Sequence, residues 1–93
     1  MHTLHIVSKA PGHRRFRECL GMVGDQDAIL LTGNGVIAIA DTHIQLPDQV
    51  YALTDDLQAR ALADKDQVPH NCTAIDFETM VELSIQAQRV VSW

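Results

Sequence analysis

The sequence contains few cysteines and no cysteine motif. Only two are present, Cys19 and Cys72, and they lie too far apart for a CxxC pair. A disulfide-stabilised secreted domain would need more, so this usage is typical of a reducing compartment. The first residues also lack the basic start and long apolar core of a secretory signal. We therefore expect the protein to be cytoplasmic.

Long apolar runs and long charge runs are missing as well. No apolar stretch approaches the ~20 residues that span a bilayer, so we expect no membrane segment. The formal net charge is −5, which disfavours direct nucleic-acid binding because phosphates would be repelled. One local exception is a basic cluster of Arg14, Arg15 and Arg17. It is either a solvated helix start or a contact for an acidic partner.

Metal-binding motifs are absent from the sequence. It has neither an HExxH motif nor paired CxxC motifs. Its five histidines fit no known ligand spacing: they are His2, His5, His13, His43 and His70. We expect His2 and His5 to point to opposite faces of a strand, because they are three residues apart. The sequence thus predicts no metal site, and nothing in it indicates a cofactor.

The composition that is present describes a small globular protein. The chain has 93 residues, of which 46% are hydrophobic, and we expect residues 1–93 to form a single domain. A domain of this size buries only roughly 60–65% of the surface of its unfolded chain. Its stability alone should be marginal, so we expect it to assemble with partners and to self-associate when isolated.

Short apolar runs alternate with helical periods along the chain. Strands are predicted at residues 3–7, 28–32, 50–53 and 73–75, and residues 90–93 can add a fifth. Alternation of this kind favours βαβ units and a parallel sheet. The predicted fold is α/β, a three-layer sandwich with a four- or five-stranded, mostly parallel sheet flanked by helices.

Three amphipathic helices are predicted between the strands. The first has an apolar face formed by Phe16, Cys19, Leu20 and Val23. The second covers residues 55–63, with Thr54 as its cap and a buried stripe of Leu57, Ala61 and Leu62. The third follows Asp76 as its cap, and its apolar side comes from Phe77, Met80, Val81 and Ile85.

Residues 33–40 give conflicting local signals. Asn34-Gly35 between two apolar runs is typical of a β-hairpin turn, and the Val and Ile that follow favour strand. The same residues can instead form a short helix that leaves a parallel strand. Propensity alone slightly favours the hairpin.

Taken together, a series of short blocks resembles one known family, the TusB/DsrH proteins. The blocks keep the family's order and spacing over nearly the whole chain, and the most distinctive is Val50–Leu53 followed by Asp55–Leu62. The others are Thr3–Pro11, Arg17–Leu20, Asp27–Leu31, Gly35–Ala38, Ile75–Phe77 and Val90–Trp93. The sequence departs from the family at its end, where relatives often have one more apolar residue after the tryptophan.

The resemblance implies a subunit of a sulfurtransferase complex that does not act alone. Such a subunit assembles with TusC- and TusD-like (DsrF- and DsrE-like) chains into a heterohexamer. The complex passes persulfide sulfur to a TusE/DsrC-like acceptor, toward 2-thiolation of the tRNA wobble uridine. The alternatives are a DsrH-type subunit of a sulfur-oxidation complex and an α/β binding module unrelated to sulfur. The resemblance also implies that residues 36–40 are helical.

Cys19 is the candidate for sulfur chemistry, as a persulfide carrier. Persulfide formation needs a thiolate, which Arg15 one turn earlier would favour and Glu18 would oppose. Cys19 also lies on an apolar helix face, where a cysteine commonly packs as a small hydrophobe. In related complexes the main catalytic cysteine belongs to the TusD/DsrE-type subunit, so a mainly structural role is expected here. Cys72 is interpreted as incidental.

Three further features have ordinary structural interpretations. Asp56 and Arg60, next to Asp55, are spaced for an ion pair along a helix. Gly33-Asn34-Gly35 is too short a glycine pattern to indicate a phosphate site. The apolar end, Val90–Trp93, is either an exposed contact surface or an edge strand.

Overall fold

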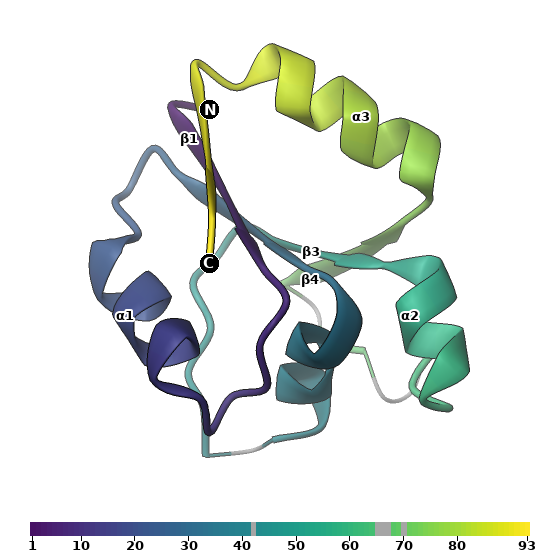
Figure 1. The fold of residues 1–93 in the computed structure, drawn as a ribbon. Helices are drawn as coiled ribbons and strands as arrows, with labels where there is room; N and C mark the ends of the chain where they lie inside the picture. The colour runs from purple at the N-terminus through teal and green to yellow at the C-terminus, as the bar shows by residue number, and fades with distance from the viewer. Residues whose placement is uncertain (42, 65–67, 70) are drawn as a thin grey trace.

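The computed structural model describes residues 1–41, 43–64, 68–69 and 71–93. They contain a five-stranded sheet of β1 (Thr3–Val7), β2 (Ala28–Leu31), β3 (Val50–Leu53), β4 (Cys72–Ile75) and β5 (Arg89–Ser92). The strand order is β4-β3-β2-β1-β5, and every neighbouring pair is parallel (Figure 1). The predicted α/β fold is confirmed, with the residues at 90–92 forming the fifth strand.

Within the described residues, four helical segments connect the strands. They are α1 (Arg14–Met22), the 3₁₀ helix η1 (Gly33–Ala40), α2 (Thr54–Ala59) and α3 (Phe77–Gln86). The first three connections step along the sheet in one direction, and α3 returns from β4 to β5 on the far side of β1. Because parallel crossovers are right-handed, α1, η1 and α2 lie on one face of the sheet and α3 lies on the other (Figure 1).

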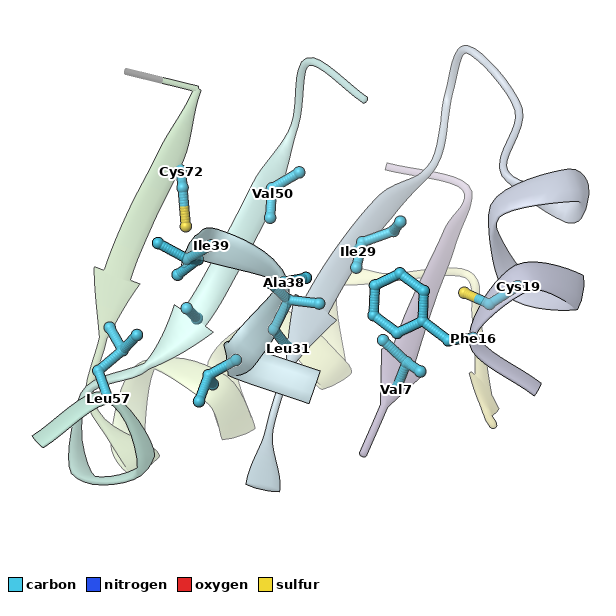
Figure 2. Close-up of a cluster of buried hydrophobic side chains, with 12 residues drawn as sticks. Val7, Phe16, Cys19, Ile29, Leu31, Ala38, Ile39, Val50, Leu57 and Cys72 are labelled. Carbon is cyan, nitrogen blue, oxygen red and sulfur yellow. The ribbon is translucent and has the colours of Figure 1, made fainter. Parts of the chain in front are cut away.

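Two hydrophobic clusters lie on the two sides of this sheet. The larger joins the sheet to α1, η1 and α2 and includes Val7, Phe16, Cys19, Ile29, Leu31, Val36 and Leu57 (Figure 2). The smaller lies under α3 and consists of Leu4, Ala28, Leu30, Ile75 and Leu83. All four residues of β2 are buried, as expected for a strand covered on both faces. The predicted three layers are therefore present.

Residues 33–40 form η1, so the hairpin that propensity favoured is wrong and the helix is confirmed. β2 and β3 are parallel, which requires a crossover rather than a tight turn. The glycine that resembled a hairpin signal has a packing role instead. A methyl group on Gly35 would collide with the carbonyl oxygen of Val7, so only glycine lets η1 approach β1 this closely.

The second helix is shorter than predicted. It ends at Ala59 instead of residue 63, and Ala61 adopts a left-handed conformation with φ 54°. The N–H of Leu62 then donates to the carbonyl of Leu57 at 2.8 Å and closes the turn. Ala61 is exposed, so it does not belong to the buried stripe. The hydroxyl of Thr54 does not cap the helix but donates to the carbonyl of Ile75 at 3.0 Å.

The last helix begins as predicted but packs through a different face. The Asp76 carboxylate accepts a hydrogen bond from the N–H of Thr79 at 2.8 Å, which confirms it as the N-cap. The buried side chain of α3 is Leu83, with Met80 packed beside it. Three of the four residues predicted to form the packed side, Phe77, Val81 and Ile85, are exposed. No described helix is long and apolar enough to cross a membrane.

Candidate functional site around Cys19 and the C-terminus

Cys19 lies in the middle of α1 and points toward the sheet. The helix begins after His13, whose ring nitrogen Nδ1 accepts a hydrogen bond from the N–H of Arg15 at 3.0 Å. Phe16 and Cys19 are three residues apart, so they share the face of α1 that packs on the sheet, and both are buried (Figure 2). Only 1% of the Cys19 surface is exposed. The thiol therefore sits inside the core and not at an open surface.

The surroundings of Cys19 favour the thiol over the thiolate. Burial raises its pKa to about 11, and the positive charge of Arg15 opposes that shift only partly. Since the thiolate is the reactive form, Cys19 in the isolated chain is held in its unreactive state. Cys72 at the start of β4 is also buried, and burial raises its pKa to about 11.

Arg15, expected to activate Cys19, has other partners. Its guanidinium carbon lies 4.8 Å from the centre of the Trp93 ring, in a cation–π arrangement. It also donates to the Glu18 carboxylate at 3.2 Å, and Arg14 donates to the same carboxylate at 2.8 Å. The hydrogen bond from Arg14 is the main reason that the pKa of Glu18 is lowered. Two of the three clustered arginines are thus partly neutralised.

His5 lies at the centre of a group of hydrogen-bonded side chains that connects the first and last strands. The sequence did not reveal this group. His5 is 2% exposed, and its Nε2 lies 3.0 Å from Oδ2 of Asp27. Its Nδ1 lies 3.1 Å from Nε1 of Trp93. An indole nitrogen can only donate, so we assign Nδ1 as the acceptor and place the ring proton on Nε2, facing Asp27. Every ring nitrogen of this buried histidine is satisfied.

Asp27 anchors this group. Its carboxylate accepts the N–H of Gly24 at 2.9 Å and the N–H of Thr3 at 3.2 Å. The Gly24 hydrogen bond is the largest cause of its lowered pKa, and His5 and Thr3 lower it further. His2 also approaches Asp27, at 3.9 Å. The prediction that His2 and His5 diverge is wrong, because His2 precedes β1 and does not follow its alternation.

A signal for the His5–Asp27 contact exists in the strand pattern. In the parallel register of β1 and β2, Leu4 faces Ala28, which sets Thr3 beside Asp27 and places His5 on the same face. A polar histidine inside an apolar strand needs a partner, and Asp27 is the acidic residue immediately before the neighbouring strand. The described residues contain no cluster of three or more side chains arranged to hold a metal.

The remaining predicted residues are dispersed. Asp56 and Arg60 do not pair along the helix but hold the start of η1. Asp56 accepts the N–H of Gly33 at 2.8 Å, and Arg60 donates to the side-chain oxygen of Asn34. His43 lies far along the chain in an exposed turn, and His70 lies outside the described residues. His43 does not belong to the group around Cys19.

The C-terminal segment is an edge strand with part of its apolar surface exposed. β5 pairs with β1 in parallel, and the N–H of Trp93 donates to the carbonyl of Ile6 at 2.8 Å. Of the two interpretations of this segment, an exposed contact surface or an edge strand, the structure shows the edge strand. Val90 nevertheless remains exposed.

A hollow of about 640 Å³ lies between the end of α1 and residues 45–49. Its lining includes Leu20, Val23 and Asp27 but not Cys19. It lies at the amino ends of β2 and β3, whereas parallel sheets bind ligands beyond the carboxyl ends of their strands. The hollow and the candidate cysteine therefore do not form one site.

The fold and this site define a small, parallel α/β domain whose candidate cysteine is buried in the core and is not exposed as a nucleophile. The same fold occurs in two solved structures. The crystal structure of the YchN protein from Escherichia coli matches with a TM-score of 0.72 and 10% identity over 100% of both chains. The solution structure of Tm0979 from Thermotoga maritima matches with a TM-score of 0.70 and 23% identity, covering 90% of this chain and 92% of that one.

Sequence comparison identifies the family. Residues 9–90 match the family model described as DsrH like protein. Protein TusB of Enterobacter sp. (strain 638) is 34% identical over 97% of this chain and 99% of its own length. Protein TusB of Escherichia coli is 31% identical over 100% of this chain and 99% of its own length. The chain belongs to the DsrH-like family, which confirms the resemblance drawn from the sequence.

Proposed function

We propose that this chain is the TusB-type subunit of a sulfur-relay complex that serves 2-thiolation of the tRNA wobble uridine. The observation that carries the proposal is the end-to-end similarity to proteins named TusB. The same similarity favours tRNA thiolation over sulfur oxidation, although the family model bears the name DsrH. Because tRNA is modified in the cytoplasm, the proposal places the protein there.

Within that complex we assign the chain a mainly structural role. Its partners are TusC- and TusD-like subunits in a heterohexamer, and a TusE-like protein accepts the sulfur. The burial of Cys19 and its raised pKa support this assignment, because a sulfur carrier needs an accessible thiolate. Persulfide transfer through Cys19 stays a prediction of the sequence, and it requires α1 to move and expose the thiol in the assembled complex.

Co-expression tests the assembly. The chain, tagged, is produced together with the TusC- and TusD-like proteins of its own genome, and the affinity-purified material is analysed by size exclusion and mass spectrometry. We expect the three chains to elute together. Elution of the tagged chain alone would contradict the proposed function. A dissimilatory sulfite reductase gene near this gene would favour the DsrH-type alternative.

Complementation tests the role of Cys19. In a strain that lacks this gene, the wild-type gene should restore 2-thiouridine in bulk tRNA, measured by liquid chromatography and mass spectrometry. We expect Cys19→Ala, which keeps a small apolar group in the core, to restore it to the same level. Loss of 2-thiouridine with Cys19→Ala, while the complex still assembles, would establish the cysteine as a sulfur carrier.

A further inference from the structure

One face of α3 carries large apolar side chains that are exposed and belong to neither hydrophobic cluster. Phe77, Val81 and Ile85 are 60%, 41% and 77% exposed. Their i, i+4, i+8 spacing places them on a single face of the helix, and Leu83 on the opposite face packs against the sheet. We call these three residues the α3 stripe. Among the described elements α3 alone covers its side of the sheet (Figure 1). Since the three side chains are exposed, the stripe belongs to the outer surface of that layer.

Exposed apolar side chains gathered on one face are characteristic of protein contact surfaces. The stripe needs such an explanation because it lies outside both hydrophobic clusters, and α3 is already packed on the sheet through Leu83 and Met80. In water, a helix with apolar residues on both faces exposes one of them unless a second protein covers it.

The charges beside the stripe indicate what kind of protein covers it. Glu78 and Glu82 are exposed and flank the stripe along one side of the helix. Within the described part of the chain neither carboxylate has an ion-pair partner. An acidic edge of this kind favours a partner that presents lysine or arginine beside its own apolar patch.

The same charges disfavour a second copy of this chain. A two-fold pairing of stripes centred on Val81 would bring the Glu82 carboxylates of both copies close together. The formal net charge of −5 on each chain adds to that repulsion. A heterologous partner avoids both effects.

We propose that the α3 stripe is the contact through which this chain binds a neighbouring relay subunit, a folded protein with an apolar patch edged by lysine or arginine. This inference rests on the proposed function and adds to it the surface that makes the assembly. It also explains why α3 departs from the packing predicted from its sequence, because the α3 stripe then packs against another chain and not against the sheet.

The test introduces negative charges into the α3 stripe. The control introduces one at an exposed apolar residue elsewhere. The variant Val81→Glu/Ile85→Glu is co-expressed with the TusC- and TusD-like chains beside the wild type and Met22→Glu. Met22, on α1, is also an exposed apolar residue, at 61%, but lies on the other side of the sheet. We expect the amount of partner that co-purifies with the double variant to be at least about tenfold lower than with the wild type. Met22→Glu should co-purify with the wild-type amount. Because all three positions are exposed, the isolated variants should keep the wild-type circular dichroism spectrum and Tm.

The outcomes separate the two proposals. If the wild type retains both partners and the folded double variant retains them equally well, the stripe is not the contact and the inference is overturned, while the proposed function stands. If the wild type itself retains neither partner, the proposed function fails and the contact fails with it. If the isolated wild type forms a dimer in sedimentation experiments that the double variant abolishes, the stripe joins copies of this chain and the heterologous contact is overturned.

A charge reversal tests the expected chemistry of the partner. Glu78→Lys/Glu82→Lys should lower the affinity for the complementary subunit about tenfold at low salt, and less at high salt, where charges are screened. An unchanged affinity at low salt would overturn the basic edge assigned to the partner.

Discussion

Trp93 donates its indole N–H to Nδ1 of His5 across 3.1 Å, joining the last residue of the chain to the first strand. The two rings are stacked, with centroids 6.1 Å apart. His5 in turn donates to Asp27, which precedes β2. Three neighbouring strands are therefore linked through side chains as well as through their backbone ladder, and the edge strand is held by more than its backbone hydrogen bonds.

Removing the indole N–H should weaken this link. In Trp93→Phe the ring remains, but Nδ1 of buried His5 loses its donor, and leaving a buried acceptor unpaired costs about 1–3 kcal/mol. We expect the free energy of unfolding in urea to fall by roughly that amount. Phe77→Leu is the control, because Phe77 is an aromatic residue that is mostly exposed, and we expect it to change stability little. Equal effects of the two changes would show that the His5 contact contributes nothing.

Asp27 should make folding sensitive to acid. Its pKa is lowered in the folded protein, chiefly by the Gly24 hydrogen bond, so its carboxylate stabilises the fold above the unfolded pKa of about 4. That stabilisation is lost as the pH falls through the folded value, since the unfolded state then binds the proton more readily. Asp27→Asn should be less stable at pH 7 and lose less stability on acidification, measured by urea unfolding from pH 7 to pH 2. An acid dependence as steep as that of the wild type would refute this role.

Two glycines should respond oppositely to the same change. In Gly35→Ala the added methyl group meets the backbone of Val7, which cannot move without distorting β1, so we expect a loss of about 3 kcal/mol. Gly21, inside α1, has nothing within 4 Å of the added methyl group. Gly21→Ala should therefore stabilise the protein by about 0.5–1 kcal/mol through helix propensity. Thermal unfolding of both variants checks the prediction, and a harmless Gly35→Ala would contradict the close approach of η1 to β1.

The two cysteines should be nearly inert in the native isolated chain. With both pKa values raised to about 11, only on the order of one thiol in a thousand is ionised at pH 8, and both are shielded from reagents. Labelling with a thiol reagent at pH 8 should be at least about a hundredfold slower than in denaturant, where both thiols react. Rapid native labelling of Cys19 would show that α1 opens readily and would revive the carrier hypothesis.

At the candidate site, the sequence predicted which residues share a helix face but not which side chains from distant segments they contact. The spacing of Phe16 and Cys19 predicted correctly that they share a helix face, because helical periodicity is local. It did not predict that Arg15 would pair with Glu18 and Trp93, since the position of Trp93 depends on the crossover that places β5 next to β1. The ion pair expected between Asp56 and Arg60 failed for a similar reason. Each binds a different partner on η1, a segment more than twenty positions away.

The sequence by itself determined the periodicities, and with them the five strands, the helices α1, α2 and α3 and their order, whereas its local signals conflicted at η1. Those follow from forces between near neighbours in the chain, which is why apolar spacing and the Asp76 cap could be interpreted without coordinates. The tertiary structure alone decided which apolar face of α3 packs inward and which faces solvent, and which partner His5 finds. Both depend on the order in which the strands lie side by side, because burial and hydrogen bonding between distant residues are fixed only when the sheet assembles.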